Sequence, residues 1–221
     1  MHRVDLLHLY VDPQPNGGAL NMAIDEALLE STAAISLRFY RWTGPSVSIG
    51  YFSKFADVEQ YEVQPDIVRR WTGGGIVPHG EDITYSVIVP ANHEFFLQSS
   101  AEIYATLHEG IRHVLSTNGI PATLAGAASP TISDACFANA VRADVLFKGK
   151  KIAGAAQRRT RAGLLHQGSL QLGLPRETFH AEFANTLSAS VERKELQAAT
   201  LARAHLLVRD KYGTSAWLRR R

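Results

Sequence analysis

Cysteine is almost absent from this chain, since Cys136 is the only one among 221 residues. An internal disulfide is therefore excluded, as is typical of proteins from a reducing compartment. Long apolar runs are also missing, because charged residues interrupt the hydrophobic stretches within a few positions. Residues 1–5 lack the apolar core of a secretion signal. We therefore predict a cytoplasmic protein without a membrane-spanning segment.

Excess charge of one sign is missing as well. The formal net charge is only +2, which is small for a dedicated nucleic-acid binder, and no series of stacking aromatics accompanies the basic residues. Nucleic acid is therefore set aside as a partner. A hydrophobic content of 45% in 221 residues is enough to bury one substantial core. No internal repeat is visible, so we predict a single domain over residues 1–221.

What the chain does have is a run of three glycines, Gly73, Gly74 and Gly75, between an arginine pair, Arg69 and Arg70, and His79. Residues without a Cβ can adopt dihedrals closed to others and let backbone N–H groups approach a ligand. Residues 66–68 and 83–89 have the composition and alternation of strands. The glycines are thus expected at a sheet edge or crevice; the alternative is a tight hairpin with incidental charges.

A second informative segment, residues 147–172, predicts a β-hairpin. In its first strand, alternation places Lys151, Ala153, Ala155 and Gln157 on one face and Ile152, Gly154 and Ala156 on the other. The second strand is expected over residues 164–172, with His166 and Gly168 near its start. Three arginines in the intervening turn are either solvated or contact an acidic partner protein: Arg158, Arg159 and Arg161.

Cys136 lies between these segments, after an Ala-, Gly-, Ser- and Pro-rich stretch at residues 124–133. It is either a buried small hydrophobe or a nucleophile, which would need activating partners such as Lys151 or His79. His79 itself could bind a carbonyl, shape a tunnel mouth or serve only as a structural hydrogen-bonding group.

The coarse order of elements predicts an α+β fold. We expect a helix at residues 20–31, several strands up to residue 89, a helix at 96–118, two or three strands up to 172, and helices from 177 onward. The sheet should be mixed and mostly antiparallel, flanked by helices. In the first helix, Asp25 and Glu26 lie off the apolar face and are either solvated or support a neighbouring loop.

Five segments in register resemble the lipoate-protein ligase and octanoyltransferase family, which is related in catalytic fold to the biotin protein ligases. The similarity covers most of the chain. Its motifs are Leu-Asn-Met-Ala-Ile-Asp-Glu-Ala-Leu at 20–28, the strands at 37–42 and 47–52, the glycine loop at 69–86, Asp144 with the Gly-Lys-Lys-Ile and Gly-Ala-Ala-Gln run of 148–158, and Leu-His-Gln-Gly-Ser-Leu at 165–170.

Two departures from the family pattern and one further resemblance bear on the activity. Arg142-Ala143-Asp144 stands where many ligases have Arg-Asn-Asp, which weakens a strict ligase assignment. Only one or two helices are expected after about residue 183, so the small C-terminal accessory domain of stand-alone ligases is not expected. Cys136 with Phe137 looks like the Cys-Phe element of the cysteine-dependent octanoyltransferase branch.

The resemblance implies an octanoyltransferase in which Cys136 takes an octanoyl group from acyl carrier protein and passes it to a lysine of a lipoyl domain, such as the glycine cleavage H protein. Lys151 would act as acid and base or face the carbonyl oxygen. Substrate would lie in a tunnel beside the glycine loop. The implied binding residues are Arg69, Arg70, Gly73, Gly74, Gly75, His79, Asp144, Gly154, Ala155, His166 and Gly168.

No cofactor, no metal and a monomer are expected for this transferase. The alternative is an ATP- and Mg²⁺-dependent lipoate-protein ligase acting through lipoyl-AMP, with a separate accessory chain where one is needed; Cys136 would then be dispensable. A non-catalytic carrier-binding protein is disfavoured, because a scaffold has no chemical need for Lys151 or the glycine loop.

Overall fold

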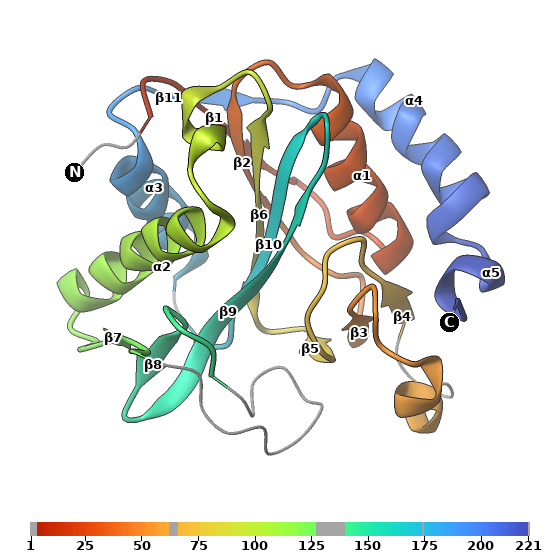
Figure 1. Cartoon of the computed structure of the whole chain (residues 1–221), viewed down its shortest axis with the longest axis horizontal. Helices are drawn as coiled ribbons and strands as arrows, with labels where there is room; N and C mark the ends of the chain where they lie inside the picture. Colours follow the sequence, from red (N-terminus) through yellow and green to blue (C-terminus); the bar gives the residue numbers. More distant parts are fainter. Residues whose placement is uncertain (1–3, 62–65, 127–139, 174, 221) are drawn as a thin grey trace.

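The computed structural model describes residues 4–61, 66–126, 140–173 and 175–220, with the side chains of residues 60 and 61 excluded. Cys136 and Phe137 lie outside the described residues. The described part is built on two sheets with helices on both faces of the larger one (Figure 1).

The larger sheet has eight strands among the described residues. Their spatial order is β11 (Val191–Lys194), β1 (Leu7–Val11), β2 (Ile35–Tyr40), β6 (Ile83–Pro90), β10 (Gly163–Leu170), β9 (Lys150–Arg159), β8 (Val145–Phe147) and β7 (Thr123–Leu124). The pairs of β1 with β11 and with β2 are parallel, and the other pairs are antiparallel. The predicted α+β class with a mixed, mostly antiparallel sheet is confirmed.

Two helical layers cover this sheet (Figure 1). On one face, α2 (Ser100–Thr117) and α3 (Arg176–Leu187) close the main apolar core. On the other face, α1 (Gly18–Ser31) packs with α4 (Ala198–Leu207) over a second core. A capping box between Ser99 and Glu102 fixes the start of α2. The predicted helices at 20–31 and 96–118 are confirmed, although η2 (Glu94–Leu97) is a separate turn before α2.

The smaller sheet carries the glycine loop. Its central strand β3 (Ser46–Ile49) pairs in parallel with β4 (Asp66–Arg69) and antiparallel with β5 (Val77–His79). The glycine loop joins β4 to β5, which flank β3 and do not pair with one another. The alternative of a tight hairpin is therefore wrong, and the loop instead crosses one end of β3.

A buried ion cluster joins α1 to the larger sheet. The Arg38 guanidinium donates to Asp12 at 2.6 Å and to Asp25 at 2.7 Å, and none of these side chains is more than 3% exposed. Asp25 also accepts from Ser86 and from Gln167, each at 2.8 Å. Asp25 is therefore buried and structural rather than solvated, but its partners Arg38, Ser86 and Gln167 lie on strands and not on the neighbouring loop that the sequence analysis proposed.

The C-terminal segment is tied to the beginning of the glycine loop. It comprises η3 (Val208–Tyr212) and α5 (Ser215–Leu218). The Trp217 indole N–H donates to the Arg69 carbonyl at 3.0 Å. Arg69 donates in turn to the carbonyls of Leu218 and Arg220, so β4 and the C-terminal segment hold one another.

Candidate active site

The centre of the candidate site is a buried ion pair on the larger sheet. The Lys151 ammonium lies 2.8 Å from Asp144 Oδ2, and the side chains are only 4% and 0% exposed. The same Oδ2 accepts the backbone N–H of Val141 at 2.7 Å. The Tyr104 hydroxyl donates to Asp144 Oδ1 and accepts the Ala155 N–H at 3.0 Å. The carboxylate is thus held by three different donors, as a buried charge requires.

A β-bulge directs Lys151 toward this carboxylate. Val145 pairs with Ala153 and Leu146 with Lys151, so Ile152 is the extra residue on β9. The predicted alternation is wrong at this point, because Lys151 lies over Gly154 rather than on the opposite face. A Cβ built at Gly154 would lie 2.4 Å from Lys151 Cε. Only glycine at this position leaves room for the lysine.

The glycine loop is fixed from inside by Arg70. The guanidinium donates through Nη2 to the Gly73 and Gly75 carbonyls at 3.0 and 2.9 Å. Through Nη1 it donates to the Ser48 carbonyl and hydroxyl. Gly74 has φ +84°, which other residues rarely adopt, and its Cβ position would lie 3.4 Å from the Ala156 Cβ. The loop therefore lies against the lysine strand β9.

A cavity of about 530 Å³ opens where the loop, β9 and the first turn of α2 meet. This volume is within the usual range of small-ligand pockets. A narrower void of about 30 Å³ continues between the two sheets and has room for about one water molecule. Ala155 and Ala156 line both spaces. The lining of the cavity also includes Gly73, Gly74, Tyr104, Val141 and Arg142, and that of the void includes Arg70, His79, Gly154 and Gly168.

His79 lines the narrow void, but both of its ring nitrogens are engaged. Nδ1 lies 2.9 Å from Asp82 Oδ2, and Nε2 lies 2.7 Å from the Ser48 hydroxyl. Burial lowers the pKa of His79, so we assign a neutral ring that donates to Asp82 and accepts from Ser48. Burial by itself would raise the pKa of Asp82, but hydrogen bonds from His79, Ser169 and the Gly80 backbone lower it to about 2. The ring also stacks on Trp42 at 4.0 Å.

Two other predicted residues on β10 shape the opposite face of the sheet. His166 is fully buried between Gln157, at 3.0 Å, and the Tyr85 hydroxyl, at 3.3 Å. Burial lowers the pKa of His166 well below its ordinary value, so the ring is neutral. Gly168 is required for the packing of Tyr85, because a Cβ there would lie 2.3 Å from the ring.

Arg69 and the three hairpin arginines have no contact with the Lys151–Asp144 ion pair among the described residues. The Arg69 guanidinium donates to backbone carbonyls of the loop at 50–53 and of the C-terminal segment. Arg158 belongs to β9, and its guanidinium lies over the rings of Tyr51 and Trp71. Arg159 donates to two carbonyls near η2, and Arg161 is exposed.

The structure thus brings together Lys151, Asp144, Gly154, Ala155 and the glycine loop, with Arg70 and His79 behind the loop. It places Arg69 and His166 in supporting contacts away from the Lys151 ammonium. The sequence analysis missed Tyr104, His108 and Asp82. Tyr104 and His108 are four residues apart on α2, a spacing that predicts only a shared helix face, whereas Asp82 follows Gly-Glu in what reads as a surface turn.

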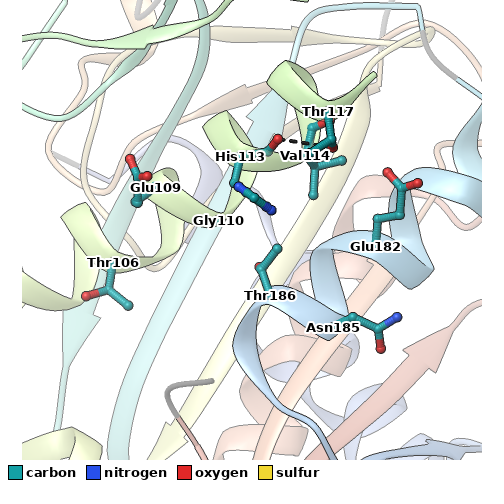
Figure 2. Close-up of a pocket in the computed structure, with 9 residues that line it drawn as sticks. All are labelled: Thr106, Glu109, Gly110, His113, Val114, Thr117, Glu182, Asn185 and Thr186. Carbon is teal, nitrogen blue, oxygen red and sulfur yellow. Dashed lines mark hydrogen bonds between the residues drawn. The ribbon is translucent and has the colours of Figure 1, made fainter. Parts of the chain in front are cut away.

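A separate cleft of about 500 Å³ lies between α2 and α3 (Figure 2). Polar side chains from both helices line it, among them His113, Glu182 and Thr186. Gly110 lets the helices approach there, since a Cβ would lie 2.6 Å from the Thr186 hydroxyl. None of the predicted site residues lines this cleft, so we assign it no part in the chemistry.

The model of the lipoyl protein ligase A/B catalytic domain matches residues 18–203. The chain belongs to this family. The resemblance found in the sequence is therefore confirmed, and it extends over both the glycine loop and the lysine strand.

Individual relatives and solved structures agree with this assignment. Octanoyltransferase LipM of Oceanobacillus iheyensis is 34% identical over 217 residues, covering 92% of this chain and 79% of the relative. Octanoyltransferase LipM of Brevibacillus brevis is 30% identical, covering 96% and 98%. A putative lipoate protein ligase from T. acidophilum, solved with bound lipoic acid, superposes with a TM-score of 0.75 at 22% identity, covering 98% of this chain and 97% of that one. Lipoate-protein ligase A bound with ATP gives a TM-score of 0.75 at 20% identity, covering 99% and 98%.

Among the described residues, no helix combines the length and apolar composition needed to cross a bilayer. The described ranges also contain no group of three or more His, Cys, Asp or Glu side chains arranged to hold a metal ion.

Proposed function

We propose that this chain is an octanoyltransferase of protein lipoylation, which moves an octanoyl group from acyl carrier protein to a lysine of a lipoyl domain, such as the glycine cleavage H protein. The observation that carries the proposal is the similarity to relatives named octanoyltransferase at 34% and 30% identity over most of both chains. The structural neighbours named as ligases are at most 22% identical in the cases above and support the fold alone.

The proposed chemistry has two acyl-transfer steps. In the first, the Cys136 thiolate attacks the thioester carbonyl of the octanoyl carrier; a new C–S bond forms and the carrier thiolate leaves. In the second, the neutral amine of the acceptor lysine attacks the acyl-enzyme; a C–N bond forms, the Cys136 thiolate leaves and the amine loses a proton. One thioester replaces another in the first step, so ATP is not required.

The buried ion pair suits both steps. Lys151 lies over Gly154, the residue before Ala155, which lines the cavity, and we assign its ammonium to the reacting carbonyl. As an ammonium it would stabilise the oxyanion, and by exchanging a proton it would serve the leaving thiolate or the attacking amine. The octanoyl chain would enter the narrow void over Ala155 and Ala156, gaining ~0.8 kcal/mol per buried methylene. A void of about 30 Å³ must widen to accept it.

The proposal is tested by following octanoylation of a purified lipoyl domain by mass spectrometry. One arm supplies octanoyl acyl carrier protein without ATP, and the other supplies free octanoate or lipoate with ATP and Mg²⁺. We expect turnover in the first arm, its loss in Lys151→Ala, and its retention in Lys150→Ala, which removes an exposed lysine from the same strand. Turnover only in the second arm would instead identify a lipoate-protein ligase.

A further inference from the structure

His108 has an unusual environment for a histidine that does not line the candidate cavity. Its side chain is fully buried on α2, between Tyr104, whose ring centroid is 4.1 Å away, and His166, at 5.8 Å. Burial lowers the pKa of His108 to about 4, so the ring is neutral and carries one N–H. Nδ1 lies 2.7 Å from the Ala143 carbonyl oxygen. Since a carbonyl can only accept, the single proton of the ring is on Nδ1.

The other ring nitrogen has no hydrogen-bond partner among the described residues. A buried acceptor without a partner costs stability, and an apolar side chain of similar volume would avoid that cost. The presence of histidine here is therefore not explained by packing. What an apolar residue could not supply is the Nδ1–H donor to Ala143.

Ala143 needs such a donor because its backbone is strained. Its φ of +67° is in the left-handed region, which alanine rarely adopts. The N–H of Ala143 donates to the Ala125 carbonyl at 2.8 Å, so the residue is also held on its N-terminal side. This conformation turns the chain immediately before Asp144, whose carboxylate reaches Lys151.

We propose that His108 is a positioning residue for the acyl transfer: it holds the strained Ala143 peptide so that the Asp144 carboxylate stays in contact with Lys151. His108 acts through the backbone and touches no reacting group. The inference rests on the proposed function for its kinetic consequence, but its geometric consequence can be measured without turnover. Tyr104 on α2 bonds to Asp144, His166 on β10 packs against the Tyr104 ring, and Tyr85 on β6 bonds to His166; none of these titratable groups bonds to the Ala143 carbonyl.

The test compares two substitutions at one position. His108→Asn keeps an N–H donor near the position of Nδ1, whereas His108→Leu fills a similar space without a donor. We expect His108→Leu to lower kcat about tenfold to a hundredfold with unchanged KM for both protein substrates, because displacing a catalytic group by about 1 Å has effects of this size. His108→Asn should recover most of the wild-type kcat. Thermal unfolding establishes that both variants are folded at the assay temperature.

A measurement independent of turnover follows the Val141 amide by hydrogen exchange, because its N–H donates to Asp144 Oδ2. In His108→Leu this amide should exchange about tenfold faster or more, while the Thr160 amide in the β9–β10 turn, bonded to the Gly163 carbonyl, stays unchanged. Wild-type kcat and wild-type Val141 exchange in His108→Leu would overturn the proposal, as would equal impairment of the Leu and Asn variants. An inactive wild-type enzyme would refute the proposed function alone, and the exchange experiment would then decide the role of His108.

Discussion

Gly154 offers a direct test of where Lys151 lies, because Lys151 fills the space that a side chain at position 154 would take. A Cβ at this position would lie 2.4 Å from Lys151 Cε, 2.7 Å from Nζ and 3.3 Å from Asp144 Oδ1. Ordinary van der Waals contact begins at 3.4 Å, so in Gly154→Ala the end of the lysine must retreat by about 1 Å. The ion pair, now 2.8 Å long, would then be broken or replaced by a different geometry.

The expected consequence is a loss of activity without a loss of fold. A misplacement of about 1 Å typically costs up to a hundredfold in rate, and we expect kcat for octanoyl transfer to fall about ten- to a hundredfold. The free energy of unfolding should fall by less than the about 3–5 kcal/mol of a fully broken buried ion pair, because the flexible lysine keeps its charge near the carboxylate and alanine is favoured over glycine in a strand by about 0.5–1 kcal/mol.

The assay measures octanoyl transfer to a lipoyl domain together with urea unfolding. Gly44→Ala serves as the matched control, since a Cβ there would meet no atom within 4 Å. Wild-type kcat in Gly154→Ala would refute the placement of Lys151 over Gly154.

Three further predictions concern stability. Gly168→Ala should lower the free energy of unfolding by about 1–3 kcal/mol, because its Cβ would lie 2.3 Å from the buried Tyr85 ring; an unchanged urea midpoint would contradict this packing. Arg38→Met should cost about 3–5 kcal/mol, because it leaves the buried carboxylates of the α1 cluster unpaired, and a loss below 1 kcal/mol in the same measurement would show that they are solvated. The free energy of unfolding should also fall on acidification below about pH 6.5, because histidines that stay neutral in the folded chain bind protons in the unfolded chain. The loss is about 1.4 kcal/mol per pH unit for each such histidine. Equal unfolding free energies at pH 7.5 and pH 5 would contradict this for the buried histidines whose pKa is lowered, namely His79, His108, His166 and His180.

The parts of the fold that could be predicted are those with a repeating local signal. Residues 83–90 and the hairpin of β9 and β10 alternate over many positions, and the helices at α1 and α2 have apolar faces. β5 gives no such signal, because it has three residues and one of them is proline. β11 is an exposed edge strand with the sequence Val-Glu-Arg-Lys, so its assignment depends on pairing with β1 and not on its own composition.

The candidate site could be predicted at the level of segments but not of geometry. The bulge at Ile152 turns Lys151 toward Asp144, yet a strand of small residues carries no local sign of a bulge. The position of Tyr104 and His108 beside Asp144 results from packing α2 against the sheet, over about 40 residues of separation. Arg69 and Arg70 are adjacent in the sequence, and only the structure separates the one that binds the C-terminal segment from the one that holds the glycine loop.

The central claim, a cysteine acyl-enzyme, is tested most directly by the intact mass of the protein after mixing with octanoyl acyl carrier protein in the absence of ATP. The proposal predicts one octanoyl adduct on the wild-type protein, none on Cys136→Ala, and loss of the adduct when a lipoyl domain is added. An equal adduct on Cys136→Ala would contradict it, as would an absent adduct together with lipoyl-domain modification only in the presence of free lipoate and ATP.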